Sequence, residues 1–163
     1  MSTIEDIIQA HHGILFKICR AYADDEDFDD LYQECLINIW KGLKSFEGDS
    51  KLSTWVYRVA LNTSLTYSRN QKTRNKNFSS GHQKMDQVQD DSENELEERI
   101  ELLLRAVREL EKNDRSVILL YLDKKSYKEI SEILGITATN VGAKINRIKK
   151  KLFELIKTLE NEG

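Results

Sequence analysis

The sequence predicts an all-α protein built from two small helical domains joined by a flexible linker. Proline is absent and only seven of the 163 residues are glycine, so long stretches contain no residue that breaks a helix. Apolar residues recur every three or four positions, and the alternating β-branched runs that mark strands are missing. Because 33% of the residues are charged, each helix has only a narrow apolar stripe with which to build a core.

Three helices are expected in the N-terminal domain, residues 1–70. The first follows a capping box of Ser2 and Glu5, after which isoleucine and leucine recur at helical spacing. The second begins in the acidic run at 24–30, where carboxylates can cap a helix and suit its positive end. Ser53 caps the third. Each of the three is amphipathic, so a core can form where their apolar stripes meet.

A polar stretch separates the two domains. Residues 71–91 contain few strongly apolar side chains and show no helical period, so they cannot offset the entropy cost of becoming ordered. We therefore expect a flexible linker there. Stretched out, the segment from Arg74 to Asp91 could span roughly 60 Å, which is close to two turns of a DNA duplex. Two separate DNA contacts are within the reach of one such chain.

The C-terminal domain, residues 92–163, contains the outline of a helix-turn-helix. After two expected helices, Ser126 and Glu129 form a capping box for a third. Gly135 then breaks the helix, and Thr137 caps the long final helix. Two helices joined by a short turn at a glycine are typical of domains that bind DNA.

The final helix has a buried stripe and a polar face. Its apolar residues step by four, three, four and three, which places them on one side. The polar face carries Asn140, Lys144, Arg147 and Lys151. Such a face can lie in a major groove, where asparagine and arginine read base edges and lysine holds phosphates. The alternative is a solvated basic face on a helix that only packs against its neighbours.

The net charge changes sign along the chain. Residues 99–163 carry 14 basic and 10 acidic side chains, whereas residues 1–70 carry 7 basic and 11 acidic ones. Only the C-terminal part is therefore suited to a nucleic acid, and the acidic remainder opposes DNA. A second partner is expected to help dock the protein on its DNA.

Several function classes are excluded by what the sequence lacks. It has no nucleophile–base set, phosphate-binding glycine loop or metal-ligand spacing, so an enzyme is not expected. Cys19 and Cys35 lie in helical patterns without a CxxC partner, so neither a metal site nor a cofactor is expected. The acidic N-terminus is not a secretory signal and no apolar run could cross a membrane, so we expect a cytoplasmic protein without membrane insertion.

Two long segments carry a family resemblance. They are DDLYQECLINIWKGLKSFEGDSKLSTWVYRVALNTSL and SYKEISEILGITATNVGAKINRIKKKL, in that order and with a polar linker between them. Together they resemble the extracytoplasmic-function (ECF) type of sigma factor in the sigma-70 superfamily. The resemblance implies a sigma region 2 helical bundle followed by a sigma region 4 helix-turn-helix. It also implies a non-catalytic subunit that binds core RNA polymerase and directs promoter-specific transcription initiation.

The resemblance further implies which residues bind the polymerase. In that family the second helix docks on the clamp helices of the largest subunit, and the C-terminal domain meets the flap of the second subunit. The corresponding residues of the second helix are Asp30, Gln33, Glu34, Ile37, Trp40 and Lys41. Tryptophan dominates many protein interfaces, although Trp40 could equally pack in the core. An anti-sigma factor, which often holds such proteins inactive, is a further candidate partner.

The loop after the second helix and the start of the third helix resemble the family's reader of the minus-ten element, where one strand is opened. The implied residues are Phe46, Gly48, Asp49, Ser50, Lys51, Ser53, Arg58 and Asn62. An aromatic ring can stack on an unpaired base, short polar side chains can hydrogen-bond to it, and Arg58 can hold a phosphate. Trp55 is expected in the core. Housekeeping relatives have two adjacent aromatics here, whereas Val56 follows Trp55, which predicts weaker strand opening.

Recognition of the minus-35 element is assigned to the last helix. Relatives often carry arginine or serine where this chain has Gly142 and Ala143, so neighbouring residues are expected to make the contacts. They are Asn140, Lys144, Asn146, Arg147 and Lys151. Two other interpretations stay open. An ordinary helix-turn-helix factor that binds duplex operators alone would explain only the C-terminal half, and an interaction module would bind polymerase without reading DNA.

Overall fold

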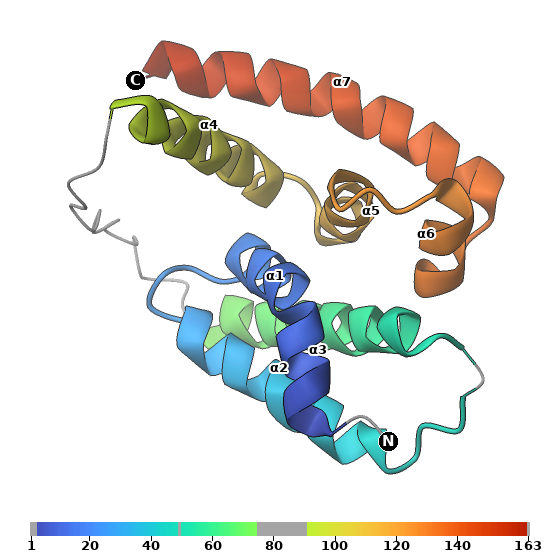
Figure 1. The fold of residues 1–163 in the computed structure, drawn as a ribbon. Helices are drawn as coiled ribbons and strands as arrows, with labels where there is room; N and C mark the ends of the chain where they lie inside the picture. Colours follow the sequence, from blue (N-terminus) through green and yellow to red (C-terminus); the bar gives the residue numbers. More distant parts are fainter. Residues whose placement is uncertain (1–2, 49, 75–90, 163) are drawn as a thin grey trace.

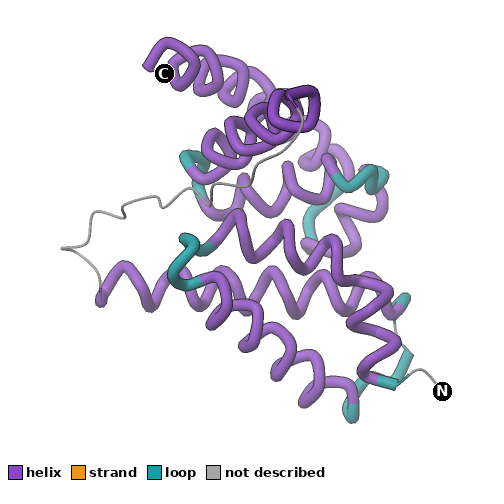
Figure 2. The backbone as a smooth tube through the Cα atoms, turned by 60° about the vertical axis from the view of Figure 1, so that its left-hand side comes forward, coloured by secondary structure: helices purple, strands orange, loops and turns teal. Residues whose placement is uncertain are grey.

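The computed structural model describes residues 3–48, 50–74 and 91–162. Within these ranges the regular secondary structure is entirely helical, which confirms the predicted all-α class (Figure 1, Figure 2). The helices are α1 (Ile4–Tyr22), α2 (Phe28–Leu43), α3 (Leu52–Arg74), α4 (Asp91–Arg108), α5 (Lys112–Leu122), α6 (Tyr127–Leu134) and α7 (Ala138–Glu162). Figure 1 shows α1 to α3 as one group and α4 to α7 as a second group above it.

The N-terminal domain is a bundle of α1, α2 and α3. Each helix turns one apolar stripe inward, and the fully buried side chains include Leu15 of α1, Leu31 and Ile39 of α2, and Leu61 of α3. The three stripes meet in one core, as the amphipathic patterns predicted. The opposite faces of the helices are left for contacts outside the bundle.

The C-terminal domain contains the predicted helix-turn-helix, formed by α6 and α7. Ser126 Oγ accepts a hydrogen bond from the Glu129 backbone amide at 3.1 Å, and the Glu129 side chain accepts one from the Ser126 amide at 3.1 Å. Gly135 has a φ of 72°, in the left-handed region that favours glycine. Thr137 Oγ1 accepts from the Asn140 amide at 3.1 Å. The caps and the break between α6 and α7 are therefore confirmed.

Three other helix boundaries differ from the sequence-based expectation. Helix α3 begins at Leu52, so Ser53, which was predicted to cap it, lies inside its first turn. The capping box of α1 is formed by Thr3 and Asp6, one position after the predicted pair of Ser2 and Glu5. Both pairs have the right chemistry, and only the backbone path selects between them. Helix α3 continues to Arg74, into the predicted linker, because no glycine or proline stops it. The rest of that linker, except Asp91 at the start of α4, lies outside the described residues.

The two domains pack against each other through α1 and α3. Helix α1 contacts α4 and α5, and α3 contacts α6. Arg108 Nε donates to the carbonyl oxygen of Arg20 at 2.9 Å, and Arg115 Nη1 donates to that of Ala21 at 3.3 Å. These two carbonyls belong to the last turn of α1, where carbonyl groups have no donor within their own helix. The C-terminal domain thus supplies hydrogen bonds that complete the end of α1.

Candidate nucleic-acid and protein interfaces

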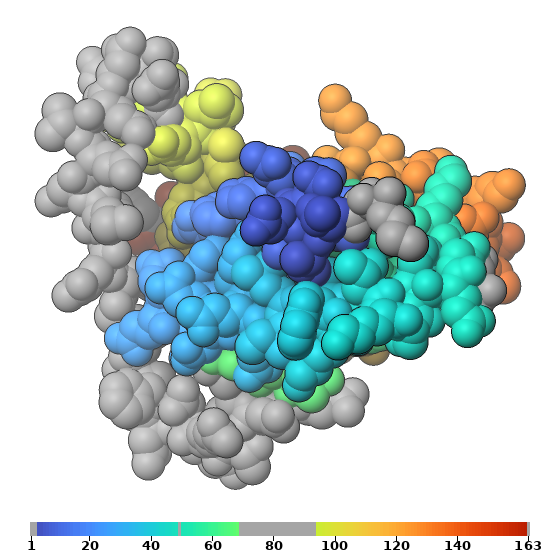
Figure 3. Space-filling model, turned by 60° about the horizontal axis from the view of Figure 1, so that its bottom comes forward, coloured from blue at the N-terminus to red at the C-terminus, as the bar shows by residue number. Residues whose placement is uncertain are grey.

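One face of α2 is open to solvent and carries all six residues predicted to bind the polymerase. They are Asp30, Gln33, Glu34, Ile37, Trp40 and Lys41, and each is exposed. Figure 3 looks onto the side of the molecule where α2, in blue to cyan, lies at the surface. The buried residues of α2, such as Leu31 and Ile39, occupy the opposite side of the helix. Alternation at helical spacing therefore gives α2 one face for the core and one for a partner.

The sequence left open whether Trp40 packs in the core or lies at the surface, and its exposure in the structure answers this. Its side chain is 51% exposed and that of Ile37 is 48% exposed, so neither packs in the core. Lys44 Nζ lies 5.1 Å from the centre of the Trp40 ring, which holds a cation over the indole. Tryptophan is one of the residue types that most often anchor protein interfaces. The exposed face of α2 therefore has the chemistry of a docking surface.

The turn between α2 and α3 holds the first group of predicted minus-ten residues. Phe46 is half-buried, with its ring centre 5.3 Å from that of Trp55. Gly48 has a φ of 82°, which a side chain would strain. Ser50 is partly buried and Lys51 is exposed, whereas Asp49 lies outside the described residues. Trp55 packs against the core, as predicted.

The remaining minus-ten residues lie on α3. Ser53 is partly buried in the first turn of the helix, and Arg58 and Asn62 are exposed one turn apart. Arg58 is already engaged: its Nε donates to the carbonyl oxygen of Ile133 at 3.1 Å, and its Nη2 donates to that of Glu132. These carbonyls lie at the C-terminal end of α6, where the helix dipole attracts a cation. Arg58, which is predicted to hold a DNA phosphate, is thus bound to the other domain.

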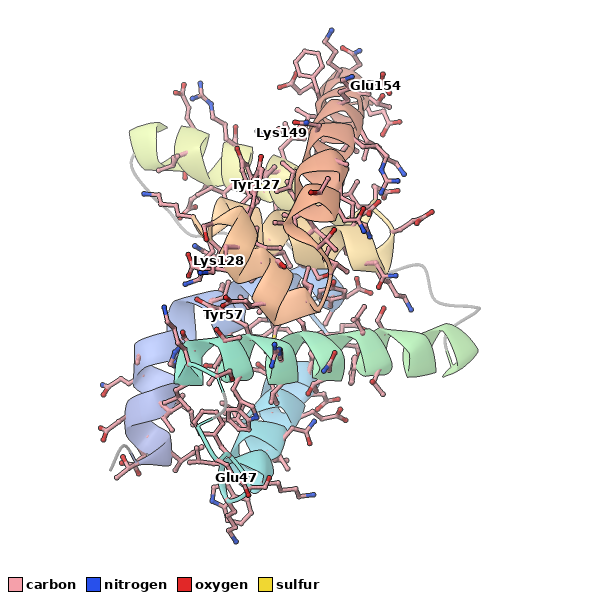
Figure 4. All side chains as sticks on the ribbon, turned by 90° about the vertical axis from the view of Figure 1, so that its right-hand side faces the viewer. Glu47, Tyr57, Tyr127, Lys128, Lys149 and Glu154 are labelled. Carbon is pink, nitrogen blue, oxygen red and sulfur yellow. The ribbon has the colours of Figure 1, made fainter. Side chains whose placement is uncertain are left out.

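Tyr57, beside Arg58 on α3, makes a second contact between the domains that the sequence analysis did not identify. Its hydroxyl donates to Asp123 Oδ2 at 2.9 Å, and Lys125 Nζ lies 4.9 Å from its ring centre. Burial and the Asp123 carboxylate raise the pKa of Tyr57. Figure 4 shows Tyr57 on α3 facing α6. Its main partner is 66 positions away in the chain, so no local pattern could have revealed the contact.

The predicted minus-35 residues lie on α7, and they differ in exposure and in whether another side chain pairs with them. Asn140, Asn146, Arg147 and Lys151 are exposed, and Lys144 is half-buried. Arg147 Nη2 forms an ion pair with Asp114 Oδ1 at 3.1 Å, in which the Asp114 side chain is only 9% exposed. Lys149 and Lys150, which were not among the predicted residues, are also exposed. Figure 4 shows Lys149 on α7, and its Nζ lies 4.4 Å from the ring centre of Tyr121.

The glycine at position 142 has a structural explanation. A Cβ atom at this position would lie 3.3 Å from Tyr127 Cε2, tighter than ordinary van der Waals contact. The absence of a side chain therefore lets α6 and α7 approach closely at this point. A larger residue here would require the Tyr127 ring to move by a few tenths of an ångström.

A cleft of about 460 Å³ lies between α3 and the helix-turn-helix. Its polar lining includes Arg58 and Asn62 from the predicted minus-ten group and Lys144 from the predicted minus-35 group. Leu65 and Ile136 contribute apolar surface. Residues predicted to touch two separate promoter elements therefore border one space in this arrangement.

Two further expectations concern metals and membranes. Among residues 3–48, 50–74 and 91–162, no cluster of histidine, cysteine, aspartate and glutamate has the geometry to hold a metal ion. No helix within the same ranges is long and apolar enough to cross a membrane.

Comparison with known proteins identifies two family regions in the chain. Residues 7–74 match the model of sigma-70 region 2, and residues 100–152 match that of sigma-70 region 4. The chain is 28% identical to the ECF RNA polymerase sigma-E factor of Escherichia coli strain K12, covering 94% of this chain and 85% of that protein. It is 30% identical to the RNA polymerase sigma factor YlaC of Bacillus subtilis, covering 92% of this chain and 90% of YlaC.

Solved structures show the same fold. CnrH in complex with the cytosolic domain of CnrY has a TM-score of 0.67 and 21% identity, covering 95% of this chain and 88% of CnrH. The sigma factor RpoE in complex with the anti-sigma factor NepR from Bartonella quintana has a TM-score of 0.68 and 19% identity, covering 94% of this chain and 95% of RpoE.

Proposed function

The chain belongs to the sigma-70 family and is an RNA polymerase sigma factor of the ECF type, and from that premise we propose which of its surfaces performs each step of initiation. The exposed face of α2 binds the core polymerase, with Ile37 and Trp40 as its apolar anchors. The observation that carries this assignment is the 51% exposure of Trp40 on a helix whose other side is buried. A tryptophan left in water on a rigid helix is suited to bury its ring against a partner.

We assign promoter recognition to both domains. The minus-ten surface consists of Phe46, Gly48, Asp49, Ser50, Lys51, Ser53, Arg58 and Asn62. The minus-35 surface consists of Asn140, Lys144, Asn146, Arg147 and Lys151. The first surface joins a half-buried aromatic to polar groups at a tight turn, which suits an unstacked base, and the second lies on a helix that can enter a major groove.

The packing of the two domains implies that they must separate before DNA binds. Arg58 is hydrogen-bonded across the domain boundary to α6, so one of the proposed DNA contacts is held by the other domain. Duplex DNA could not reach Asn62 and Lys144 together while both line one cleft. Binding of core polymerase to α2 and to the C-terminal domain would hold the two domains apart. This requirement explains how a chain with its own DNA surfaces depends on a second partner.

A protein regulator is a further proposed partner. CnrH and RpoE, two proteins of the same fold, were solved in complex with CnrY and with the anti-sigma factor NepR. The closed arrangement is the one in which the two domains pack against each other. An anti-sigma factor that stabilised it would keep Arg58 and Lys144 from promoter DNA. We place this action in the cytoplasm, where core polymerase works, and we assign the chain no catalytic step of its own.

Run-off transcription tests the assignment of α2. Purified core polymerase would be combined with the chain on a pool of promoter fragments, using the native protein, Ile37→Ala and Trp40→Ala. We expect specific transcripts with the native protein and at least a tenfold loss with Trp40→Ala, because a central interface aromatic typically contributes about 2 kcal/mol or more. Leu96→Ala is the matched control, since Leu96 is 60% exposed on α4, away from the proposed surface. Equal transcription by Trp40→Ala and Leu96→Ala would reject the assignment.

A further inference from the structure

The only two cysteines of the chain meet inside the N-terminal domain. Cys19 lies on α1 and Cys35 on α2, and their sulfur atoms are 3.9 Å apart. Both side chains are fully buried, so neither takes part in the proposed polymerase or promoter surfaces. The pair is therefore unexplained by the function proposed above.

The two thiols lie within hydrogen-bond distance of each other, and either could donate; Cys35 Sγ also lies 3.9 Å from the carbonyl oxygen of Ala60. The contact with Cys19 and the Ser64 hydroxyl lower the pKa of the Cys35 thiol, although burial opposes the shift. Ser64 lies on α3 and is itself fully buried. A thiolate next to a second thiol is the arrangement from which thiol–disulfide exchange proceeds.

We propose that Cys19 and Cys35 form an oxidisable pair whose disulfide links α1 to α2. The sulfur atoms would have to approach by about 1.9 Å to reach a covalent distance near 2.05 Å. With a diazene oxidant such as diamide, a Cys35–nitrogen bond forms first. The Cys19 sulfur then displaces the reduced hydrazine, so the two thiols give up two electrons and two protons to the N=N bond. The same link forms with a small-molecule disulfide, which is reduced to two thiols.

The consequence of this link is a more stable N-terminal domain with an unchanged docking face. A disulfide between positions 19 and 35 closes a loop of about 15 residues in the unfolded chain and lowers the entropy of that state. Cys35 lies on the buried side of α2, whereas Ile37 and Trp40 lie on the exposed side. Oxidation therefore raises the unfolding temperature and leaves the exposed face of α2 in place. This inference does not depend on the proposed function.

The experiment uses the full native chain treated with diamide under folded conditions, then alkylated with iodoacetamide in denaturant. We expect the intact mass to fall by two hydrogens, neither cysteine to be alkylated, and dithiothreitol to reverse both changes. The unfolding temperature of the oxidised chain should rise by on the order of 5–10 °C. Because the chain has two cysteines, an internal disulfide can only be this one.

Cys19→Ala and Cys35→Ala are the matched controls, and neither should show the diamide-dependent change in mass or unfolding temperature. Three results would overturn the proposal: two alkylated cysteines in the native chain after diamide, oxidation only to a covalent dimer, or an internal disulfide only when denaturant is present. The native-chain mass measurement stands even if either alanine variant fails to fold.

Discussion

Arg58 of α3 donates a hydrogen bond from Nε to the carbonyl oxygen of Ile133, 3.1 Å away at the C-terminal end of α6. The two residues belong to different domains and are separated by 75 positions in the chain. Arg58 is also the residue proposed to hold a promoter phosphate. The closed arrangement therefore satisfies this cation with helix carbonyls, and DNA binding must exchange one partner for the other.

The first prediction concerns Arg58→Ala. Loss of its bonds to α6 should loosen the contact between the domains and lower the free energy of unfolding by roughly 1 kcal/mol, since the guanidinium is partly solvated. Small-angle scattering of the free chain should show a larger radius of gyration. Transcription with core polymerase should nevertheless fall, because the phosphate contact is lost as well. Arg105→Ala, an exposed arginine of α4, is the control, and identical scattering by the two variants would contradict the role of Arg58.

The second prediction concerns pH and the Tyr57 hydroxyl. In the folded chain, burial and Asp123 hold the pKa of Tyr57 above its ordinary value of about 10. The folded state therefore retains this proton where the unfolded state loses it, so stability is fully present below pH 10 and falls as the pH rises further. Tyr57→Phe should show a weaker decline between about pH 10 and 11 than the native chain. Tyr22 and Tyr67 are shifted in the same direction, so the slope should shrink without vanishing.

Tyr127→Phe is the control for this prediction, because the Tyr127 side chain is 42% exposed on α6. Unfolding would be followed by circular dichroism at each pH for both variants and the native chain. An unchanged alkaline slope in Tyr57→Phe would show that the pKa of Tyr57 does not differ between the folded and unfolded states.

The third prediction compares two glycines inside helices. At Gly42 a Cβ atom would lie 2.7 Å from Trp55 Cζ2, so Gly42→Ala must displace the ring and should destabilise the chain by about 1–3 kcal/mol. At Gly13 nothing lies within 4 Å of the added carbon, so Gly13→Ala should stabilise α1 by up to about 1 kcal/mol through helix propensity. Chemical denaturation measures both. If Gly42→Ala left stability unchanged or raised it, the packing of Trp55 against α2 would be wrong.

The fourth prediction separates base recognition from phosphate binding on α7. Arg147→Ala should weaken binding of the holoenzyme to the preferred minus-35 sequence by roughly tenfold, and it should also reduce discrimination against altered sequences. Lys150→Ala, on the same helix, should weaken binding to all sequences equally. It should also reduce the slope of log affinity against log salt concentration by about one. Competition binding on a set of minus-35 variants tests both. Uniform weakening by Arg147→Ala would assign it to the phosphates.

Local signals explain which parts of the fold could be predicted from the sequence. Ser126, Glu129 and Gly135 act within a few positions of one another, so the cap and the left-handed turn follow from residue type and spacing. The choice between Ser2 and Thr3 as the first cap was missed because both residues can cap, and the difference lies in the backbone path. Helical periodicity likewise separated the two faces of α2 correctly.

Contacts between side chains on helices far apart in the sequence could not be predicted in this way. Arg147 was expected on a free polar face, yet it pairs with Asp114, 33 positions earlier. Helical spacing shows which side chains share a face, but it does not show which other helix lies opposite. The same limit applies to Tyr57 and Asp123, whose contact depends on how α3 meets the turn after α5. Family resemblance supplied the roles of these surfaces, and the structure supplied their present partners.

The most direct test of the central claim is binding to a promoter fragment, measured by fluorescence anisotropy with the chain alone, core polymerase alone, and both together. The account predicts sequence-specific binding only when both proteins are present, because the free chain keeps Arg58 and Lys144 at the contact between its domains. Sequence-specific binding of the duplex by the chain alone, with no change on adding core polymerase, would contradict the account and identify an ordinary operator-binding factor.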